Sequence, residues 1–560
     1  MLAFLLLACA PAQDDTAAAV PAEEDTASDP VSGGAEADGV YARDVLHEIV
    51  ITLAPADWDT LRFQTRSFYS LLSEGCMEGP WESPYTYVSA EATVDGEALG
   101  EIGLRKKGLI GSLSTTRPSL KIDVDHYQDG ARYHGLEKLV LNNNNQDPGR
   151  LRTCLAHDFF ADAGLVAPRC AMAHVTVNGE DLGIYSQTEN LDEDLVARRL
   201  GAEPPAMYEG TLSDFREGWT DTFDPETGAS DGHELHAVVD ALAAPDDEVL
   251  AALDQVVDLD AFYTFWAAES LAGHWDGYNA NTNNFYTYAA PSDGRLRFIA
   301  SGPDSAFDSR EPFGAGQPIW VAEGSALSNR LLRLPEAKSA YEAELERLLD
   351  DVWDEDGRLA ELDALADVVS PVDDADVRAG IAATRSVMAH RASDVAASMG
   401  TRVDVPELRG WPCFTTIGHA VVQFSTTYAS YPDGDVWGGG AATTDYVFND
   451  VAYPSTGNGV SIGEYGDGRL FWLTISEVAP GTYVAPYVIF WPDQLVAGVP
   501  IRVDGESAEG AVLYLDDTTG GNFQTIAYLG GPSLTFSTVG DTPGAPVTGT
   551  LDMDVLGSAG

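Results

Sequence analysis

Basic residues are scarce in this sequence. The 560-residue chain has 31 Lys and Arg residues against 89 Asp and Glu residues, which gives a formal net charge of -58. Such a charge repels a phosphate backbone, so the composition argues against a DNA or RNA partner. Apolar runs of about 18 residues or more are absent as well, so no transmembrane helix is expected. Hydrophobic residues still make up 44% of the chain, enough to form real cores and to exclude bulk disorder.

Cysteine is also rare, at Cys9, Cys76, Cys154, Cys170 and Cys413. No cysteine lies in a Cys-x-x-Cys motif or at ligand spacing from a histidine, which argues against zinc binding and thiol catalysis. The four that follow Cys9 are compatible with two disulfides in an oxidising compartment, and the sequence leaves all three pairings open. A buried free thiol is an open alternative for Cys154, which lies on an expected amphipathic helix over 151–163.

The amino terminus is short and apolar and ends in Leu-Leu-Ala-Cys at Cys9. It resembles a bacterial lipoprotein signal, in which this cysteine is lipidated and becomes the first residue. A secretory signal cleaved elsewhere is the alternative. Residues 10–40 are rich in Ala, Asp, Glu, Pro, Ser and Gly, which predicts a flexible acidic tether. We therefore expect a bacterial envelope protein, held at the outer membrane or cell surface by its lipid alone.

The rest of the chain predicts an α+β fold in two parts. Residues 41–400 mix strands and helices, 401–409 form a short linker, and 410–560 are dense in Thr, Tyr, Val and Gly. Turn signals throughout the last part are typical of an all-β sandwich, and no catalytic set is evident there.

Periodicity locates elements within the first part. Asn178-Gly179 predicts a tight turn that joins two strands over 174–185. Further strands are expected at 49–53, 119–125 and 138–141, and helices at 257–274 and 325–400.

One segment has a spacing known from phosphoryl-transfer enzymes. Residues 274–281 read His-x-Asp-x-x-x-x-Asn, with Asp276 placed to orient an attacking hydroxyl and Asn281 placed to hold magnesium. The short motif is unspecific by itself, since Asp and Asn are common in loops. We interpret His274 as a packing residue.

Three further residues strengthen the interpretation. Lys121 lies on an expected strand, Glu189 follows the hairpin and is placed to pair with it, and Asp304 follows an expected strand at 295–299. Phosphoryl transfer needs a cation and metal ions to neutralise the phosphates, with a carboxylate to position the nucleophile. Asp and Asn oxygens suit Mg²⁺ or Mn²⁺.

The same part of the chain resembles the CotH kinase family of atypical secretory kinases. The resemblance lies in a basic block over 105–108 and 117–121, a block over 141–152, the hairpin through 189–192, Met207-Tyr208-Glu209-Gly210, and Asp276 through Asn283-Asn284-Phe285-Tyr286. It implies a kinase-like fold, ATP and divalent-metal binding, and phosphate transfer to Ser or Thr of envelope or extracellular proteins. It also implies that Arg105 and Lys107 bind the cofactor and that Asn284 is a metal ligand alongside Asp304.

One departure from the family opens a second hypothesis. Where the family has Trp-Asp-x-Asp, this chain has Ser301-Gly302-Pro303-Asp304, so one of two carboxylates is missing. A single carboxylate with Asn is compatible with magnesium, which keeps several waters. The alternative is an inactive kinase-fold surface protein that serves as an adhesin or assembly factor. For Asn142–Asn145 we favour a polar turn over a role in the nucleotide cleft.

Overall fold

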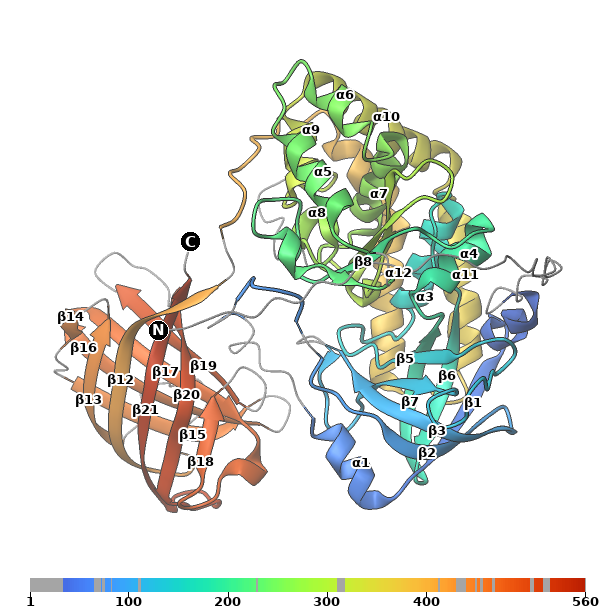
Figure 1. Ribbon diagram of the computed structural model, residues 1–560. Coiled ribbons are helices and arrows are strands. Elements are labelled where there is room, and N and C mark those ends of the chain that lie inside the picture. Colours follow the sequence, from blue (N-terminus) through green and yellow to red (C-terminus); the bar gives the residue numbers. More distant parts are fainter. Residues whose placement is uncertain are drawn as a thin grey trace, which may run out of the picture.

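The computed structural model describes residues 34–64, 72, 76–81, 83–108, 112–227, 230–309, 318–410, 413–429, 440–448, 451–453, 457–465, 469–503, 508–516 and 524–558 (Figure 1). The predicted lipoprotein signal, Cys9 and most of the predicted tether lie outside these residues. Among the helices that the structure describes, none combines the length and the apolar character needed to cross a membrane.

A closed barrel forms the first part of the molecule. Its strands follow the order β1-β2-β3-β4-β5-β7-β6, and β6 closes the barrel by pairing parallel to β1. Its apolar core includes Ile49, Ile102, Leu120 and Tyr185. The strands are β1 (Leu46–Thr52), β2 (Val88–Val94), β3 (Glu97–Lys107), β4 (Ser119–Asp123), β5 (Lys138–Asn142), β6 (Cys170–Val177) and β7 (Glu180–Thr188).

The predicted hairpin is present in this barrel. β6 and β7 pair antiparallel, and Asn178 and Gly179 between them have positive φ angles of 53° and 82°. Asn and Gly adopt such angles at low cost, which is why this dipeptide favours tight hairpin turns.

The end of the stretch 10–40, which we interpreted as a flexible tether, has regular structure. Residues Ala35–Tyr41 form the 3-10 helix η1, which overlaps that stretch except for Tyr41. Ala37, Val40 and Tyr41 are buried in the barrel core, so this end of the predicted tether is part of the domain. The short helix α1 (Pro55–Arg62) also contributes Trp58 and Leu61 to that core.

A helical lobe packs against the barrel (Figure 1). Its largest apolar core centres on Trp266 and Tyr341, whose rings stack 3.8 Å apart. A small sheet in the order β11-β10-β8-β9 lies within it. The elements are α3 (Arg152–Asp162), α4 (Glu193–Leu200), β8 (Met207–Gly210), η3 (Thr220–Thr222), β9 (Asp224–Pro225), α5 (His233–Leu242), α6 (Val249–Leu253), α7 (Leu259–Ala272), α8 (Tyr278–Asn281), β10 (Phe285–Ala289), β11 (Leu296–Ala300), η4 (Pro303–Ser305), α9 (Ala326–Leu332), α10 (Pro335–Asp351), α11 (Glu355–Val369) and α12 (Ala375–Ser398).

Two disulfides resolve the pairing that the sequence left open. Cys154 of α3 bonds to Cys170 of β6, so the free-thiol alternative for Cys154 is wrong. Cys76 bonds to Cys413 across a sequence separation of 337 residues. The second bond ties the first residues of the carboxy-terminal part to the loop before β2.

The described residues between 413 and 558, which we call the β domain, contain one continuous antiparallel sheet in the order β14-β13-β12-β21-β20-β19-β17-β16-β15, with β18 paired to β20. The sheet curls so that Tyr428 after β12 bridges Ile462 of β15, and it encloses one apolar core around Trp472. Hydrogen bonds therefore do not divide it into the two sheets that a sandwich implies. The elements are β12 (Phe414–Thr427), β13 (Ala441–Phe448), β14 (Val451–Tyr453), β15 (Gly457–Tyr465), β16 (Arg469–Ala479), β17 (Thr482–Phe490), η5 (Pro492–Gln494), β18 (Pro500–Val503), β19 (Ala508–Asp516), β20 (Gln524–Thr538) and β21 (Pro546–Ser558).

The connection between the two parts is bound to the helical lobe. Asn329 Nδ2 and Arg333 Nη2 donate hydrogen bonds to the Pro406 carbonyl oxygen at 3.1 and 2.7 Å. Val403 and Val405 pack against the lobe's apolar core. The segment 401–410, which includes the predicted linker, therefore follows the surface of the lobe instead of hanging free.

Candidate active site

The outer face of the barrel carries a row of cations. β3 and β4 pair so that Arg105 lies opposite Lys121, with Lys107 two residues further along β3. Side chains alternate across a strand, so these three share one face while Leu104 and Ile122 point into the barrel core. The register thus brings together all three basic residues that the sequence assigned to the cofactor.

Lys107 is the most constrained of these cations. Its Nζ donates a 3.0 Å hydrogen bond to Asn142 Oδ1 at the end of β5. Burial, and next the charge of Lys121, lower the pKa of Lys107 to about 8, while Glu209 and Asp304 act in the opposite direction. Asn142 therefore belongs to the site, contrary to our preference for a simple turn.

Glu189 does not pair with Lys121, so this part of the sequence prediction is wrong. Its carboxylate lies 2.8 Å from Arg169 Nη2 and 2.5 Å from Arg198 Nη2, and its own N–H donates to the Arg169 carbonyl. Two guanidinium groups therefore hold it at the end of β7.

Acidic side chains of the helical lobe, and not Glu189, act on the pKa of Lys121. Burial, and then the charges of Lys138 and Arg105, lower the pKa of Lys121. The charge of Glu226 has the largest effect in the opposite direction. Burial and the neighbouring charges of Glu209 and Asp224 raise the pKa of Glu226 to about 8. Glu209 lies in the block Met207–Gly210 that carries part of the family resemblance, whereas Glu226 follows the short strand β9 outside any motif, which is why sequence reasoning missed Glu226.

Asp276 sits in a ring of amides between α7 and β10. Asn281 Nδ2 and Asn283 Nδ2 donate to its Oδ1 at 2.6 and 3.2 Å, and Asn284 Nδ2 donates to its Oδ2 at 2.8 Å. Burial raises the pKa of Asp276, and the three hydrogen bonds oppose that shift because they favour the charged carboxylate. The three Asn residues that competed for one metal role in the sequence interpretation thus all contact the predicted catalytic carboxylate.

The side-chain amide of Asn281 has a partner at each end. Its Oδ1 accepts a 2.9 Å hydrogen bond from Arg409 Nη1, and its Nδ2 is the donor to Asp276. The metal role that the spacing predicted for Asn281 would therefore use the second lone pair of an oxygen that already binds Arg409. Arg409 lies in the segment 401–410, far from any motif.

The pKa of Asp304 is affected by the charges of two neighbouring carboxylates, one of which is Asp276. Burial, and then the charges of Asp147 and Asp276, raise the pKa of Asp304 to about 7. Asp147 is fully buried and receives N–H donors from Gly149 and Arg152 at 2.8 Å each. The charges of Asp147 and Asp276 both disfavour the ionised form of Asp304, a repulsion that a bound Mg²⁺ or Mn²⁺ would relieve. In the part of the chain that the structure describes, however, the carboxylates of this site whose oxygens lie within 4.8 Å of one another are those of Glu209, Asp224 and Glu226.

The Asn284 amide lies against the position of the missing family carboxylate. Gly302 has φ +54°, and a Cβ built there would lie 2.9 Å from Asn284 Oδ1. A side chain at 302 would therefore meet both backbone strain and the amide that contacts Asp276.

His274 behaves as the packing residue that we predicted. It is 2% exposed, its Nε2 lies 3.1 Å from the Ser301 carbonyl oxygen, and burial lowers its pKa to about 4. It is therefore neutral near pH 7 and links the Asp276 loop to the loop of Asp304.

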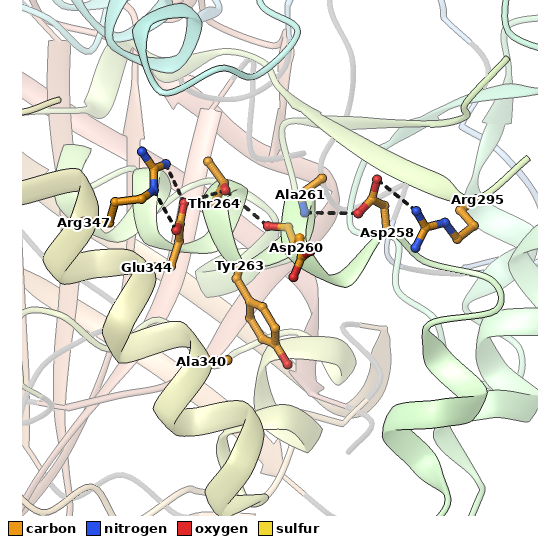
Figure 2. A pocket seen from close by; sticks show the side chains of 9 residues that line it. All are labelled: Asp258, Asp260, Ala261, Tyr263, Thr264, Arg295, Ala340, Glu344 and Arg347. Carbon is orange, nitrogen blue, oxygen red and sulfur yellow. Dashed lines mark hydrogen bonds and ion pairs between the residues drawn. The ribbon is translucent and has the colours of Figure 1, made fainter. Parts of the chain in front are cut away.

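A separate hollow of about 560 Å³ lies at the start of α7 and along α10 (Figure 2). Its charged side chains pair with one another: Arg347 with Glu344 at 2.7 Å, and Arg295 with Asp258 at 3.5 Å. Asp276 follows the opposite end of α7, about 20 Å away at 1.5 Å per residue, so this hollow is not part of the site.

Comparisons with known proteins agree with the resemblance seen in the sequence. Residues 104–379, which contain Arg105, Lys107, Lys121, Asp276 and Asp304, match the family model described as CotH kinase protein. Residues 104–379 belong to the CotH kinase family. As a CotH-family protein the chain is kinase-like and of mixed α and β content with large sheets.

Individual relatives are distant from this CotH-family chain. It is 24% identical over 237 residues to Inner spore coat protein H of Bacillus subtilis, covering 40% of this chain and 64% of that one. It is 23% identical over 236 residues to Invasin CotH3 of Rhizopus delemar, covering 36% and 38%. The chain thus spans less than two thirds of the length of these curated relatives. The Helicobacter pylori proinflammatory kinase CtkA aligns at 11% identity and a TM-score of 0.22, over 50% of this chain and 92% of that one.

Proposed function

We propose that this protein is an ATP-dependent protein kinase that transfers the γ-phosphate to Ser or Thr of envelope or extracellular proteins. The proposal rests on one observation: within the family region, a row of cations on the barrel lies in electrostatic reach of a cluster of part-buried carboxylates. Lys107 connects the two, since the charges of Glu209 and Asp304 both act on its pKa.

Each residue has a chemical task in this proposal. Lys107, Lys121 and Arg105 neutralise the phosphates of ATP, and Asp304 with Asn284 would hold Mg²⁺ or Mn²⁺, which supplies further charge neutralisation. Asp276, held charged by its amide donors, accepts the proton of the acceptor hydroxyl and orients it for in-line attack.

An inactive kinase-fold surface protein is the second candidate. Gly302 favours it, because it removes one of the two carboxylates of the family pattern and because Asn284 lies against the vacated position. The names of the relatives, a spore coat protein and an invasin, agree with an adhesin or assembly role.

Those names also support an extracellular or surface location, with the lipid on Cys9 as our proposed anchor. A Cys9→Ser variant is expected to move from the membrane fraction to the soluble fraction, because the acyl chains supply the attachment. Unchanged membrane fractionation of the variant would refute the anchor.

Transfer of labelled γ-phosphate by the full chain, to itself or to co-purified envelope proteins, tests the function. Wild type with Mg²⁺ or Mn²⁺ is expected to label protein, and Asp276→Asn is the matched control because it keeps the shape of the side chain. A thermal shift with ATP and metal reports binding separately, since a ligand specific for the native state raises the Tm. Binding without labelling would favour the inactive candidate, and the absence of both would exclude the kinase.

A further inference from the structure

Arg409 enters the site from outside the region that the family model matches. Its Nη1 donates to Asn281 Oδ1 at 2.9 Å and its Nη2 donates to the Ala280 carbonyl oxygen at 3.1 Å. Both acceptors belong to α8, the short helix that directly follows Asp276. The contact spans 128 residues of sequence, so no local motif encodes it.

The direction of these hydrogen bonds fixes the orientation of the Asn281 side-chain amide, that is, which side its oxygen and its NH₂ group face. A guanidinium group only donates, so the oxygen of the amide must face Arg409. The NH₂ group must then face the other way, where it donates to Asp276 Oδ1 at 2.6 Å. The Asp276 carboxylate only accepts, so it favours the same orientation, and Arg409 adds a second group, on the other side of the amide, that disfavours the flipped one.

The segment that carries Arg409 is held in place independently. Arg216 Nη1 donates to the Arg409 carbonyl oxygen at 2.7 Å, and Arg216 is itself paired with buried Asp214 at 2.9 Å. Tyr278, the first residue of α8, donates its hydroxyl to the same Asp214 carboxylate at 3.2 Å. Four residues beyond Arg409, the Cys76–Cys413 disulfide limits how far the segment moves.

A second carboxylate secures the other end of α8. Glu269 of α7 accepts hydrogen bonds from the Tyr278 and Asn279 N–H groups at 3.2 and 3.0 Å. Glu269 fixes the start of the short helix and Arg409 fixes its end. A four-residue helix has too few internal hydrogen bonds to hold itself, so its geometry depends on these outside partners.

We propose that Arg409 is a positioning residue of the phosphate-transfer site: it holds α8 and orients the Asn281 amide, which in turn sets the Asp276 carboxylate. This inference rests on the proposed kinase function. It extends the functional unit past the matched region to the segment 401–410. Arg409 itself does not touch the reacting groups in this assignment.

Variants of the full chain test the assignment. Arg409→Ala removes both hydrogen bonds, Arg409→Lys restores a single cationic donor, and Arg402→Ala is the control in the same segment, since Arg402 is 87% exposed and pairs with Asp404. Transfer by Arg409→Ala is expected to fall about tenfold to a hundredfold, the range for a misplaced catalytic group, with ATP affinity unchanged. Arg409→Lys should recover part of the rate, and millimolar guanidinium should recover part of it in Arg409→Ala but not in Asp276→Asn.

Hydrogen exchange measured by mass spectrometry separates this inference from the kinase function. Peptides that cover 276–284 should exchange several-fold faster in Arg409→Ala than in wild type or Arg402→Ala. Unchanged exchange would overturn the positioning role even if wild type transfers no phosphate. Transfer by Arg409→Ala at the wild-type rate would overturn it while leaving the kinase function intact, and a faster rate would mean that the segment obstructs the acceptor instead.

Discussion

The barrel and the helical lobe, which together form the kinase-like part, differ from the β domain in the kinds of side chain that they bury. Among the described residues of the β domain, the buried polar side chains are Thr426, Ser461, Thr474 and Ser476, none of which is charged. The kinase-like part buries charged groups such as Asp147, Asp214, Glu269 and Arg391. Burying a charge is costly unless it is paired and hydrogen-bonded, so a fold that keeps such groups supports each of them with partners.

Those partners surround the Asp276 loop. Arg391 of α12 donates to the Ser270 and Leu271 carbonyl oxygens at the end of α7 (2.7 and 2.9 Å), and Glu269 receives the first N–H groups of α8. The two parts therefore differ in their buried side chains: those described in the β domain carry no charge, whereas the kinase-like part buries charged groups, and two of these, Glu269 and Arg391, hold the Asp276 loop. Four predictions sharpen this contrast.

The largest effect is expected from Asp304→Ala. Removal of this carboxylate should abolish metal-dependent ATP binding, because Asp304 is the main proposed ligand of the metal ion that neutralises the β- and γ-phosphates. Calorimetry with ATP and Mg²⁺, with and without EDTA, measures the loss. Retained binding in this variant would show that the metal is held elsewhere.

Asp304→Asn is the control for correct folding. The pKa of Asp304 is raised to about 7 in the folded protein, so the folded state holds a proton that the unfolded state has already released between about pH 4 and 7. Stability of the nucleotide-free protein therefore falls as pH rises through this window. At pH 8 the Asn variant should melt at a higher temperature than wild type.

Asp276→Ala is expected to act on transfer and not on binding. The phosphate-transfer rate should fall about 10²-fold or more, the scale of losing one acid–base group, while the Kd for ATP changes little. Parallel calorimetry and transfer assays separate the two. Loss of ATP binding in this variant would place Asp276 among the metal ligands instead.

A smaller effect is expected from the two lysines, and it ranks them. Lys107→Ala should weaken ATP binding by about tenfold, since it removes a charge-assisted contact, and more than Lys121→Ala does, because Lys107 is the lysine on whose pKa Asp304 acts. The lowered pKa of Lys107, about 8, means that its charge is lost as pH rises past that value. ATP affinity should therefore decline from pH 7 to 9 in wild type and much less in Lys107→Arg. An equal pH dependence in both proteins would contradict the assignment.

The smallest effect is expected from a cut between Gly410 and Cys413. The two pieces should stay joined without reductant through Cys76–Cys413 and separate on reduction, with ATP affinity unchanged because segment 401–410 stays with the lobe. Each piece should melt in its own transition, since the β-domain core contains no residue of the kinase-like part. In a Cys413→Ser variant the cut pieces should separate without reductant. One shared transition would mean that the two parts fold as one unit.

Local patterns in the sequence determined much of the fold. The alternation over 119–123, the Asn178-Gly179 turn and the helical periodicity after 325 depend on neighbouring residues, and each corresponds to an element in the structure. The resemblance of the blocks around Lys121, Asp276 and Asn284 likewise identified the family.

Tertiary structure alone decided which residues meet. The sequence paired Lys121 with Glu189, but two arginines hold Glu189, and Glu226, which lies outside any motif, acts on the pKa of Lys121 instead. It offered three disulfide pairings, of which one formed. Arg409 lay in a stretch interpreted as a linker, yet its guanidinium contacts Asn281. Such contacts depend on where distant strands, helices and connections come together, and the pairing partner of a charge is set by that geometry, which periodicity and spacing along the chain do not encode.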